Sequence, residues 1–226
     1  MDDRQTITID VVSDVVCPWC YLGQKRLDRA IAATPEIGVV VNWRPYQLDP
    51  TIPPGGVDRQ QYMLAKFGDP DRIAQIHQRL VGLGAAEGIA FAFDAIRVAP
   101  NTLDAHRVIR WAGAAGDGVQ DGLVRRLFRL NFEEGADVGD PAVLAEAAAE
   151  AGMDDAVVRT LLPSGADVDA VMAEIATASR MGITGVPCFL LEGRYAVMGA
   201  QDAEVLADAI RRVAEAKANG ELDGVR

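Results

Sequence analysis

Two of the chain's three cysteines, Cys17 and Cys20, lie three residues apart in the stretch SDVVCPWCYLG at residues 13–23. A β-branched run precedes them and a helical pattern follows, so the first cysteine is expected at the N-terminus of a helix. There the unpaired backbone N–H groups and the helix dipole favour negative charge on sulfur. Thiol–disulfide exchange needs an attacking thiolate and a second thiol that resolves the mixed disulfide. We therefore predict that Cys17 is the nucleophile and Cys20 the resolving thiol.

The residues between the cysteines suit a substrate site. Pro18 fits the first helical turn, where a missing N–H costs nothing, and Trp19 can offer an apolar docking surface. A metal site and two unrelated core cysteines are the alternatives. A metal knuckle normally has four ligands, and the remaining candidates, Cys188, His77 and His106, contain no second close pair. We therefore prefer the redox interpretation and expect no metal.

A second element of interest is GITGVPCFLLEG at residues 182–193. An X-Pro bond at the start of a strand is a natural place for a cis peptide, although an ordinary trans proline stays an alternative. In the expected fold, Val186 and Pro187 face the Cys17 sulfur and present backbone groups to an extended substrate. Cys188 is either a small buried hydrophobe, which the usual burial of free cysteine favours, or a redox modulator that forms an alternative disulfide with the pair.

The elements that must position these residues begin with a β-α-β unit. Residues 6–16 alternate and then become continuously apolar, as in a strand that reaches the middle of a sheet. A helical period follows Pro18 and ends near Pro35 and Gly38, and residues 39–50 read as a second strand.

The middle of the chain, from about Gly56 to Met181, is almost entirely helical in its pattern. Three residues are candidate helix caps there: Asp69, Asn101 and Asp140. Strand signals return in CFLLEG and RYAVMG, and Asp202 can cap a last amphipathic helix.

This order predicts an α/β protein with a thioredoxin-like fold, β-α-β then β-β-α, interrupted by a large helical insertion. The thioredoxin-like domain would comprise residues 1–55 and 182–226, and the insertion residues 56–181.

The composition excludes several partners. The chain has 226 residues with 22 Lys and Arg against 33 Asp and Glu, a net charge of −11, which disfavours nucleic acid and anionic membranes. No segment approaches the roughly 20 apolar residues of a membrane span, and the N-terminal MDDRQTITID lacks the order of a secretory signal. We expect a cytoplasmic protein, in which a close cysteine pair is typical of redox activity.

Taken together, these motifs resemble the DsbA-type thioredoxin superfamily, specifically its cytoplasmic FrnE-like branch. Four stretches carry the resemblance: residues 13–23, WRPYQLDP at 43–50, NTLDAHR at 101–107 and TGVPCFLLEGRYAVMGAQ at 184–201. The resemblance implies a thioredoxin fold with an inserted helical domain, a catalytic disulfide at Cys17 and Cys20, and a cis-proline at Pro187. It also implies disulfide exchange with protein or small thiol substrates. Cys188 departs from the commoner residue after that proline.

The resemblance leaves two alternatives open. The superfamily contains 2-hydroxychromene-2-carboxylate isomerases and kappa-class glutathione transferases, in which the first cysteine position is typically a serine that activates glutathione. This chain has both cysteines, so that alternative ranks second. A thiol-based chaperone or binding module around Trp19 and Pro187 is the other. No cofactor is expected besides the redox-active disulfide. Glutathione could be a substrate, and apolar residues of the insertion could form a homodimer surface.

Two residues of the insertion, Asn101 and His106, could contact the site if the insertion roofs it. His106 could move a proton or touch a substrate, since histidine titrates near neutral pH. A packing or helix-surface role is the preferred interpretation of His106, and a helix-capping role that of Asn101.

Overall fold

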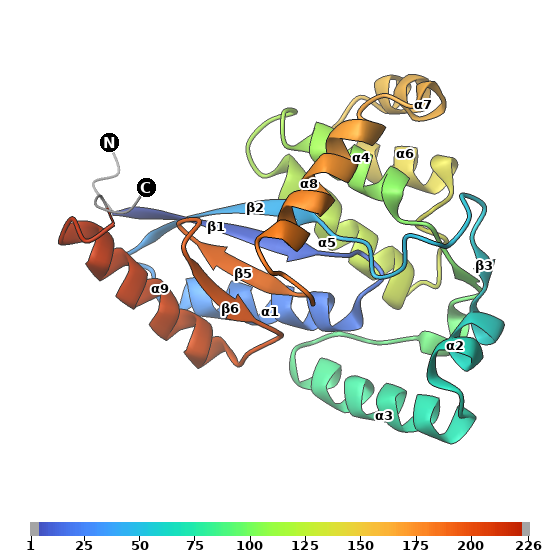
Figure 1. The fold of residues 1–226 in the computed structure, drawn as a ribbon, viewed down its shortest axis with the longest axis horizontal. Coiled ribbons are helices and arrows are strands. Elements are labelled where there is room, and N and C mark those ends of the chain that lie inside the picture. The colour runs from blue at the N-terminus through green and yellow to red at the C-terminus, as the bar shows by residue number, and fades with distance from the viewer. Residues whose placement is uncertain (1–4, 223–226) are drawn as a thin grey trace.

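The computed structural model describes residues 5–222 (Figure 1). Its centre is a four-stranded sheet in the order β2-β1-β5-β6, in which β1 runs parallel to β2 and antiparallel to β5, and β6 is antiparallel to β5. The strands are β1 (Thr6–Ser13), β2 (Gly38–Pro45), β5 (Cys188–Leu191) and β6 (Tyr195–Met198). The sheet is flanked by α1 (Pro18–Ala32) and α9 (Ala203–Ala218). The predicted β-α-β and β-β-α units are confirmed.

The side chains of β1 explain why it lies in the interior of the sheet. Ile7, Ile9 and Val11 are buried in the core formed with α1 and α9, which pack against each other. Val12 points to the opposite face and packs near α8 (Val168–Arg180). A central strand of a sheet covered on both faces needs apolar residues on both sides. This is what the continuous apolar run at the end of β1 supplies.

All the remaining elements lie between β2 and β5 along the chain. They are β3 (Val57–Asp58), α2 (Arg59–Phe67), α3 (Pro70–Ala86), the 3₁₀ helix η1 (Phe93–Ala95), β4 (Val98–Ala99), α4 (Leu103–Ala112), α5 (Val119–Phe132), α6 (Pro141–Glu150) and α7 (Asp155–Ser164), followed by α8. The middle of the chain is thus not purely helical, because β3 and β4 pair as a small antiparallel sheet. Two-residue strands are too short to show a periodicity. The domain boundaries at residues 56 and 181 stay a prediction.

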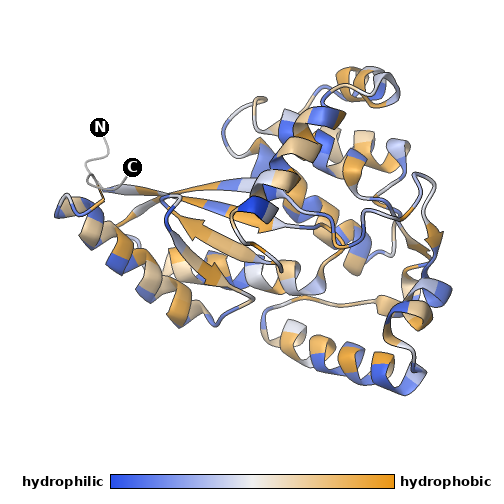
Figure 2. Cartoon of the chain, viewed as in Figure 1, coloured by the Kyte–Doolittle hydropathy of each residue, from blue (hydrophilic) through white to orange (hydrophobic). Residues whose placement is uncertain are grey.

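Figure 2 shows the amphipathic character of the helices, with α3 and α9 alternating between apolar and polar residues. Within residues 5–222 no helix is long and apolar enough to cross a bilayer.

Two predicted helix caps are confirmed. The Asp69 carboxylate accepts a hydrogen bond from the backbone N–H of Asp71 at the start of α3, and the Asp140 carboxylate accepts one from Ala142 at the start of α6. In both helices proline is the first residue, where it leaves no N–H to satisfy.

Two other caps differ from the prediction. The N-cap of α4 is Thr102, one residue after Asn101, although the Asn101 side chain still accepts a hydrogen bond from the N–H of Leu103. Asp202 occupies the N-cap position of α9 but makes no capping hydrogen bond. Its carboxylate instead lies 2.9 Å from Arg26 of α1, and the ion pair ties the two helices together.

Helix α1 is held on one side by aromatic packing with the helices of residues 56–181, which we call the middle segment. The ring of Tyr21 stacks on Phe128 with centroids 5.1 Å apart, and its hydroxyl donates a 2.6 Å hydrogen bond to Glu133. Burial and the Glu133 carboxylate raise the pKa of Tyr21. The phenol therefore stays protonated and keeps donating over a wide range of pH.

Ion pairs hold the same helix further along its length. Asp28 pairs with Arg125 of α5, and Glu87, after the end of α3, accepts hydrogen bonds from Arg26 and Arg29. The Glu87 carboxylate is almost fully buried. Helix α1 is thus fixed to the sheet and to the middle segment at once.

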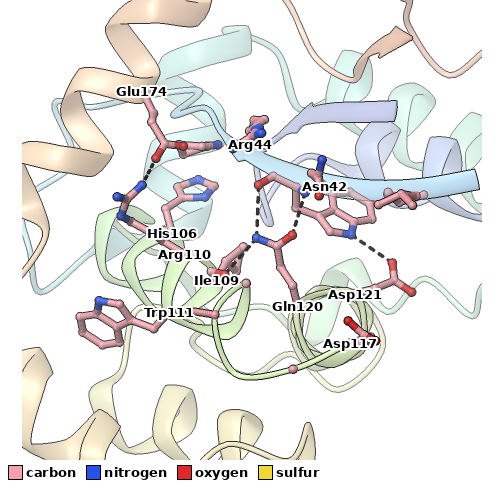
Figure 3. A pocket seen from close by; sticks show the side chains of 18 of the residues that line it. Asn42, Arg44, His106, Ile109, Arg110, Trp111, Asp117, Gln120, Asp121 and Glu174 are labelled. Carbon is pink, nitrogen blue, oxygen red and sulfur yellow. Dashed lines mark hydrogen bonds and ion pairs between the residues drawn. The ribbon is translucent and has the colours of Figure 1, made fainter. Parts of the chain in front are cut away.

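The outer edge of β2 is covered by a side chain. The backbone N–H of Trp43 donates to the Gln120 side-chain oxygen at 3.0 Å, and the Gln120 amide nitrogen donates to the carbonyls of Trp43 and Ile109 (Figure 3). The Trp43 indole N–H also donates to Asp121 at 3.0 Å. Gln120 thereby takes the hydrogen bonds that a neighbouring strand would make.

Candidate active site

Cys17 lies at the N-cap of α1, immediately after the turn that follows β1. Its backbone is extended, and Pro18 is the first helical residue. The Cys17 N–H donates to the Asp14 carbonyl at 3.0 Å, and the Cys17 carbonyl accepts from Cys20 at 3.0 Å and from Tyr21 at 3.2 Å. The sulfur of Cys17 is therefore carried by the residue that begins the helix, where backbone N–H groups favour a negative charge.

The two thiols of the motif lie together in the core. Both cysteines are reduced and buried, with 3% of Cys17 and 1% of Cys20 exposed. Burial raises the pKa of the Cys20 thiol well above its usual range, and the neighbouring Cys17 adds to this through a hydrogen bond and its charge. Cys20 is therefore held as a protonated thiol beside Cys17.

The loop before β5 completes this side of the site. The Val186–Pro187 peptide bond is cis. The Cys17 sulfur lies 3.8 Å from the Val186 carbonyl oxygen, to which its S–H donates. Gly23 of α1 faces Pro187, and a Cβ on Gly23 would come within 2.9 Å of the Pro187 ring. The absence of a side chain at Gly23 thus allows α1 to pack closely on this loop.

A cavity of about 380 Å³ opens in front of Cys17. The core contributes Cys17, Pro18, Trp19 and Val186 to its wall, and the opposite wall comes from α2, α3, η1 and β4. These elements lie beyond the carboxyl end of β1, where α1 begins (Figure 1). The volume is in the range of small-molecule sites, which are mostly apolar with a few polar groups.

The structure brings most of the predicted site residues to one place. Those that meet around the Cys17 sulfur are Cys17, Pro18, Trp19, Cys20, Val186 and Pro187.

Cys188 lies apart from the pair. It is fully buried on β5, and burial raises the pKa of its thiol. It packs with three apolar side chains on the α8 side of the sheet: Val12, Ala178 and Ile183. Cys17 and Cys20 belong to the core cluster that contains α1. This placement fits the buried hydrophobe and not the alternative disulfide.

His106 and Asn101 do not border the cavity in front of Cys17. The buried His106 ring donates from Nε2 to the Tyr46 carbonyl at 2.8 Å and lies 3.5 Å from a carboxylate oxygen of Asp14. The Asn101 amide donates to the Ile52 carbonyl at 2.6 Å. Both side chains support the loops around the site.

His106 also borders a second cavity, of about 560 Å³, between β2, α4 and α5 (Figure 3). None of the residues that line it is a cysteine. Of the two cavities, only the one at Cys17 can therefore support thiol chemistry.

The sequence analysis missed several residues of that cavity, among them Arg59, Tyr62, Lys66 and Arg79. The segment RQQYMLAKF at 59–67 interleaves basic and aromatic residues, which is a weak signal. Only the folded chain places it opposite the cysteines. His77, the other histidine, also borders the cavity, where it stacks on Phe93 at 4.2 Å. Burial and the nearby Arg59 lower its pKa.

Comparison with known proteins gives a consistent picture. Residues 8–211 match the family described as DSBA-like thioredoxin domain. The crystal structure of the probable DsbA oxidoreductase SCO1869 from Streptomyces coelicolor is similar, with 34% identity, a TM-score of 0.81, and 92% of this chain and 89% of that chain covered. The uncharacterized protein YwbO of Bacillus subtilis (strain 168) is 27% identical over 91% of this chain and 96% of its own length.

A more distant structure shares the fold. It is a 2-hydroxychromene-2-carboxylate isomerase, with 18% identity, a TM-score of 0.66, and 94% of this chain and 98% of that chain covered.

Proposed function

The chain belongs to the DSBA-like thioredoxin family, and from this premise we propose that it is a thiol–disulfide oxidoreductase with Cys17 and Cys20 as its reactive pair. The observation that carries the proposal is the placement of Cys17 at the start of α1, open to a cavity and hydrogen-bonded to a buried second thiol. A cytoplasmic location, as expected from the sequence, is part of the proposal.

In the reductive direction the Cys17 thiolate attacks one sulfur of a substrate disulfide. A bond forms between that sulfur and Cys17, and the other substrate sulfur leaves as a thiolate. Cys20 then loses its proton and attacks the Cys17 sulfur, which releases the second substrate thiol and closes the Cys17–Cys20 disulfide. Two electrons pass from the cysteine pair to the substrate. The reverse sequence oxidises a substrate dithiol.

The environments of the two thiols fit these separate roles. Cys20 has a raised pKa, so it keeps its proton and does not compete as the first nucleophile. It also lies one helical turn from Cys17, within reach of any mixed disulfide formed there. The Val186 carbonyl beside the Cys17 sulfur is placed to accept a hydrogen bond from a substrate.

The test is reduction of insulin disulfides by the wild type and three variants. Cys17→Ala is expected to lower the rate to the background, and Cys20→Ser to accumulate a mixed disulfide at Cys17 that mass spectrometry detects. Cys188→Ala, which removes a thiol on the other face of the sheet, is the matched control and should retain activity. Equal rates for wild type and Cys17→Ala would sink the proposal.

A glutathione-dependent isomerase or transferase is the second candidate, because the cavity is of a size for a small molecule and the isomerase shares the fold. Those isomerases and transferases typically have a serine at the first cysteine position. This chain has Cys17 there, which argues for redox chemistry. Glutathione binding without any disulfide exchange would favour the second candidate.

A further inference from the structure

The cavity in front of Cys17 carries three positive charges in a chain whose net charge is −11. Arg59 and Lys66 come from α2, and Arg79 comes from α3. In the described part of the chain, no carboxylate lies within ion-pair distance of any of these three side chains. Most other cations that border cavities of this protein are paired, as Arg110 is with Glu174.

The two carboxylates at the cavity already accept hydrogen bonds, although one oxygen of Asp14 has no hydrogen-bond partner in the described part of the chain. Asp14 accepts a 2.8 Å hydrogen bond from the backbone N–H of Leu48. Asp49 accepts from the N–H and the hydroxyl of Thr51, which together lower the pKa of its carboxyl group. Hydrogen bonds from uncharged donors leave the carboxylates charged, but the cavity still has three cationic side chains against these two carboxylates.

Arg59 is the cation most in need of a counter-ion. It is the first residue of α2, and its side chain is half-buried between the cavity and a neighbouring one. Burial lowers the pKa of its guanidinium, which means that the charged form is poorly solvated. A cation withdrawn from water without a partner costs free energy, and an anion that binds it recovers that cost.

The other two cations are already engaged. The Arg79 guanidinium lies 5.6 Å from the centre of the Trp19 ring, next to Cys17. The Lys66 ammonium donates a 2.8 Å hydrogen bond to the Tyr62 hydroxyl. They add positive potential at the mouth of the cavity and leave Arg59 free to make direct contacts.

The apolar lining and the volume of the cavity limit which ligands fit. Its wall includes the apolar or aromatic side chains of Trp19, Met63, Ile76, Leu80 and Phe93. A volume of about 380 Å³ accommodates a small molecule.

We infer that the site takes compact aromatic or apolar thiols and disulfides that carry an acidic group, and that Arg59 determines this specificity by pairing with the acid. This inference rests on the proposed function and narrows its substrate class. The sulfur of such a molecule reaches Cys17 while its carboxylate meets the Arg59 guanidinium, to which it can bind in a bidentate manner.

Two aromatic disulfides, one negatively charged and one neutral, make the test direct. The reduced protein is mixed with 5,5′-dithiobis(2-nitrobenzoate), a dianion, or with 2,2′-dithiodipyridine, which is neutral. In each case Cys17 displaces one aryl thiolate and Cys20 displaces the second, so that two aryl thiolates form for each protein disulfide. The rate is given by the absorbance of the released product, which is the thionitrobenzoate thiolate from the first probe and, after the leaving thiolate takes up a proton, 2-thiopyridone from the second.

Arg59→Gln is expected to slow the dianionic probe about tenfold or more, as the loss of one charge-assisted hydrogen bond would, and to leave the neutral probe unchanged. The neutral probe also reports that the variant is folded and reactive. Arg72→Gln is the matched control, because it removes the same charge from an exposed position of α3 that does not line the cavity. It should change neither rate.

The outcomes separate the inference from the function on which it rests. If Cys17→Ala reacts with both probes as fast as the wild type, the proposed redox function fails. If Cys17 is required but Arg59→Gln slows both probes equally, slows neither, or acts no differently from Arg72→Gln, the specificity assigned to Arg59 is overturned.

Discussion

At the scale of single residues, Cys17 and Cys20 have different environments because they occupy different positions on the same helix. Cys17 begins α1 and faces the cavity, whereas Cys20 lies a turn inward beneath it. The spacing was enough to predict that Cys17 begins the helix and that Cys20 follows one turn later, because helix geometry is local. Arg59 and Asp14 could not be assigned to the site in this way, since only tertiary packing brings them there.

The raised pKa of Cys20 predicts a loss of stability at alkaline pH. The folded protein holds this thiol proton more tightly than the unfolded chain, whose cysteines titrate near pH 8.5. The stabilisation is therefore complete below about pH 8.5 and is lost as the pH rises toward the folded-state pKa. The free energy of unfolding of the reduced protein should fall by up to about 1.4 kcal/mol per pH unit in that window.

Urea unfolding between about pH 7 and 10, under reducing conditions, measures this effect. A Cys20→Ala variant controls for Tyr21 and Cys188, whose pKa values are also raised. Parallel curves for wild type and variant would show that Cys20 contributes nothing to the pH dependence.

At the scale of elements, helix α1 links the reactive sulfur to everything around it. One face packs on the sheet and on Pro187, while Tyr21 and Asp28 contact α5. The sequence predicted α1 and its neighbouring strands because their hydrophobic periods are long. It did not predict β3 and β4, which are two residues each, or α7, whose pattern is interrupted by Pro163.

The close approach of α1 to Pro187 predicts that Gly23→Ala is harmful. The new methyl group would lie 2.9 Å from the Pro187 ring and 3.1 Å from Phe189. Overpacking of this kind costs about 1–3 kcal/mol, against a gain of about 1 kcal/mol in helix propensity. We expect lower stability in urea unfolding and slower insulin reduction, because the Cys17 sulfur moves relative to Val186.

Gly82→Ala is the matched control, since Gly82 lies within α3 and a Cβ there would meet no atom within 4 Å. It should keep or slightly raise stability. If Gly23→Ala behaves in the same way, the packing of α1 on the Pro187 loop does not position the site.

At the scale of the whole molecule, the sheet and the middle segment share one hydrophobic core. Residues from β1, such as Ile9, belong to the same cluster as Leu127 and Phe128 of α5 and Leu144 of α6. The sequence indicated an insertion because helical patterns separate two groups of strands. It did not indicate how tightly the two would join, because the aromatic residues of α1 and α5 meet only after folding.

This shared core predicts a single cooperative unfolding transition. Tryptophan fluorescence reports on Trp43, which is a residue of β2 buried against α5, together with Trp19 and Trp111. Far-ultraviolet circular dichroism reports mainly on the helices. The two signals should give the same midpoint and the same slope in urea. Separate midpoints would mean that the segment at 56–181 unfolds as an independent domain.

The Gln120 amide at the rim of β2 has a consequence for how copies of this protein behave in concentrated solution. An edge strand with unpaired backbone groups can pair with a strand of another molecule, which is the first step of edge-to-edge aggregation. Here the Gln120 side chain occupies the backbone hydrogen-bonding groups of Trp43. The backbone of a second molecule therefore cannot pair with β2 at this residue.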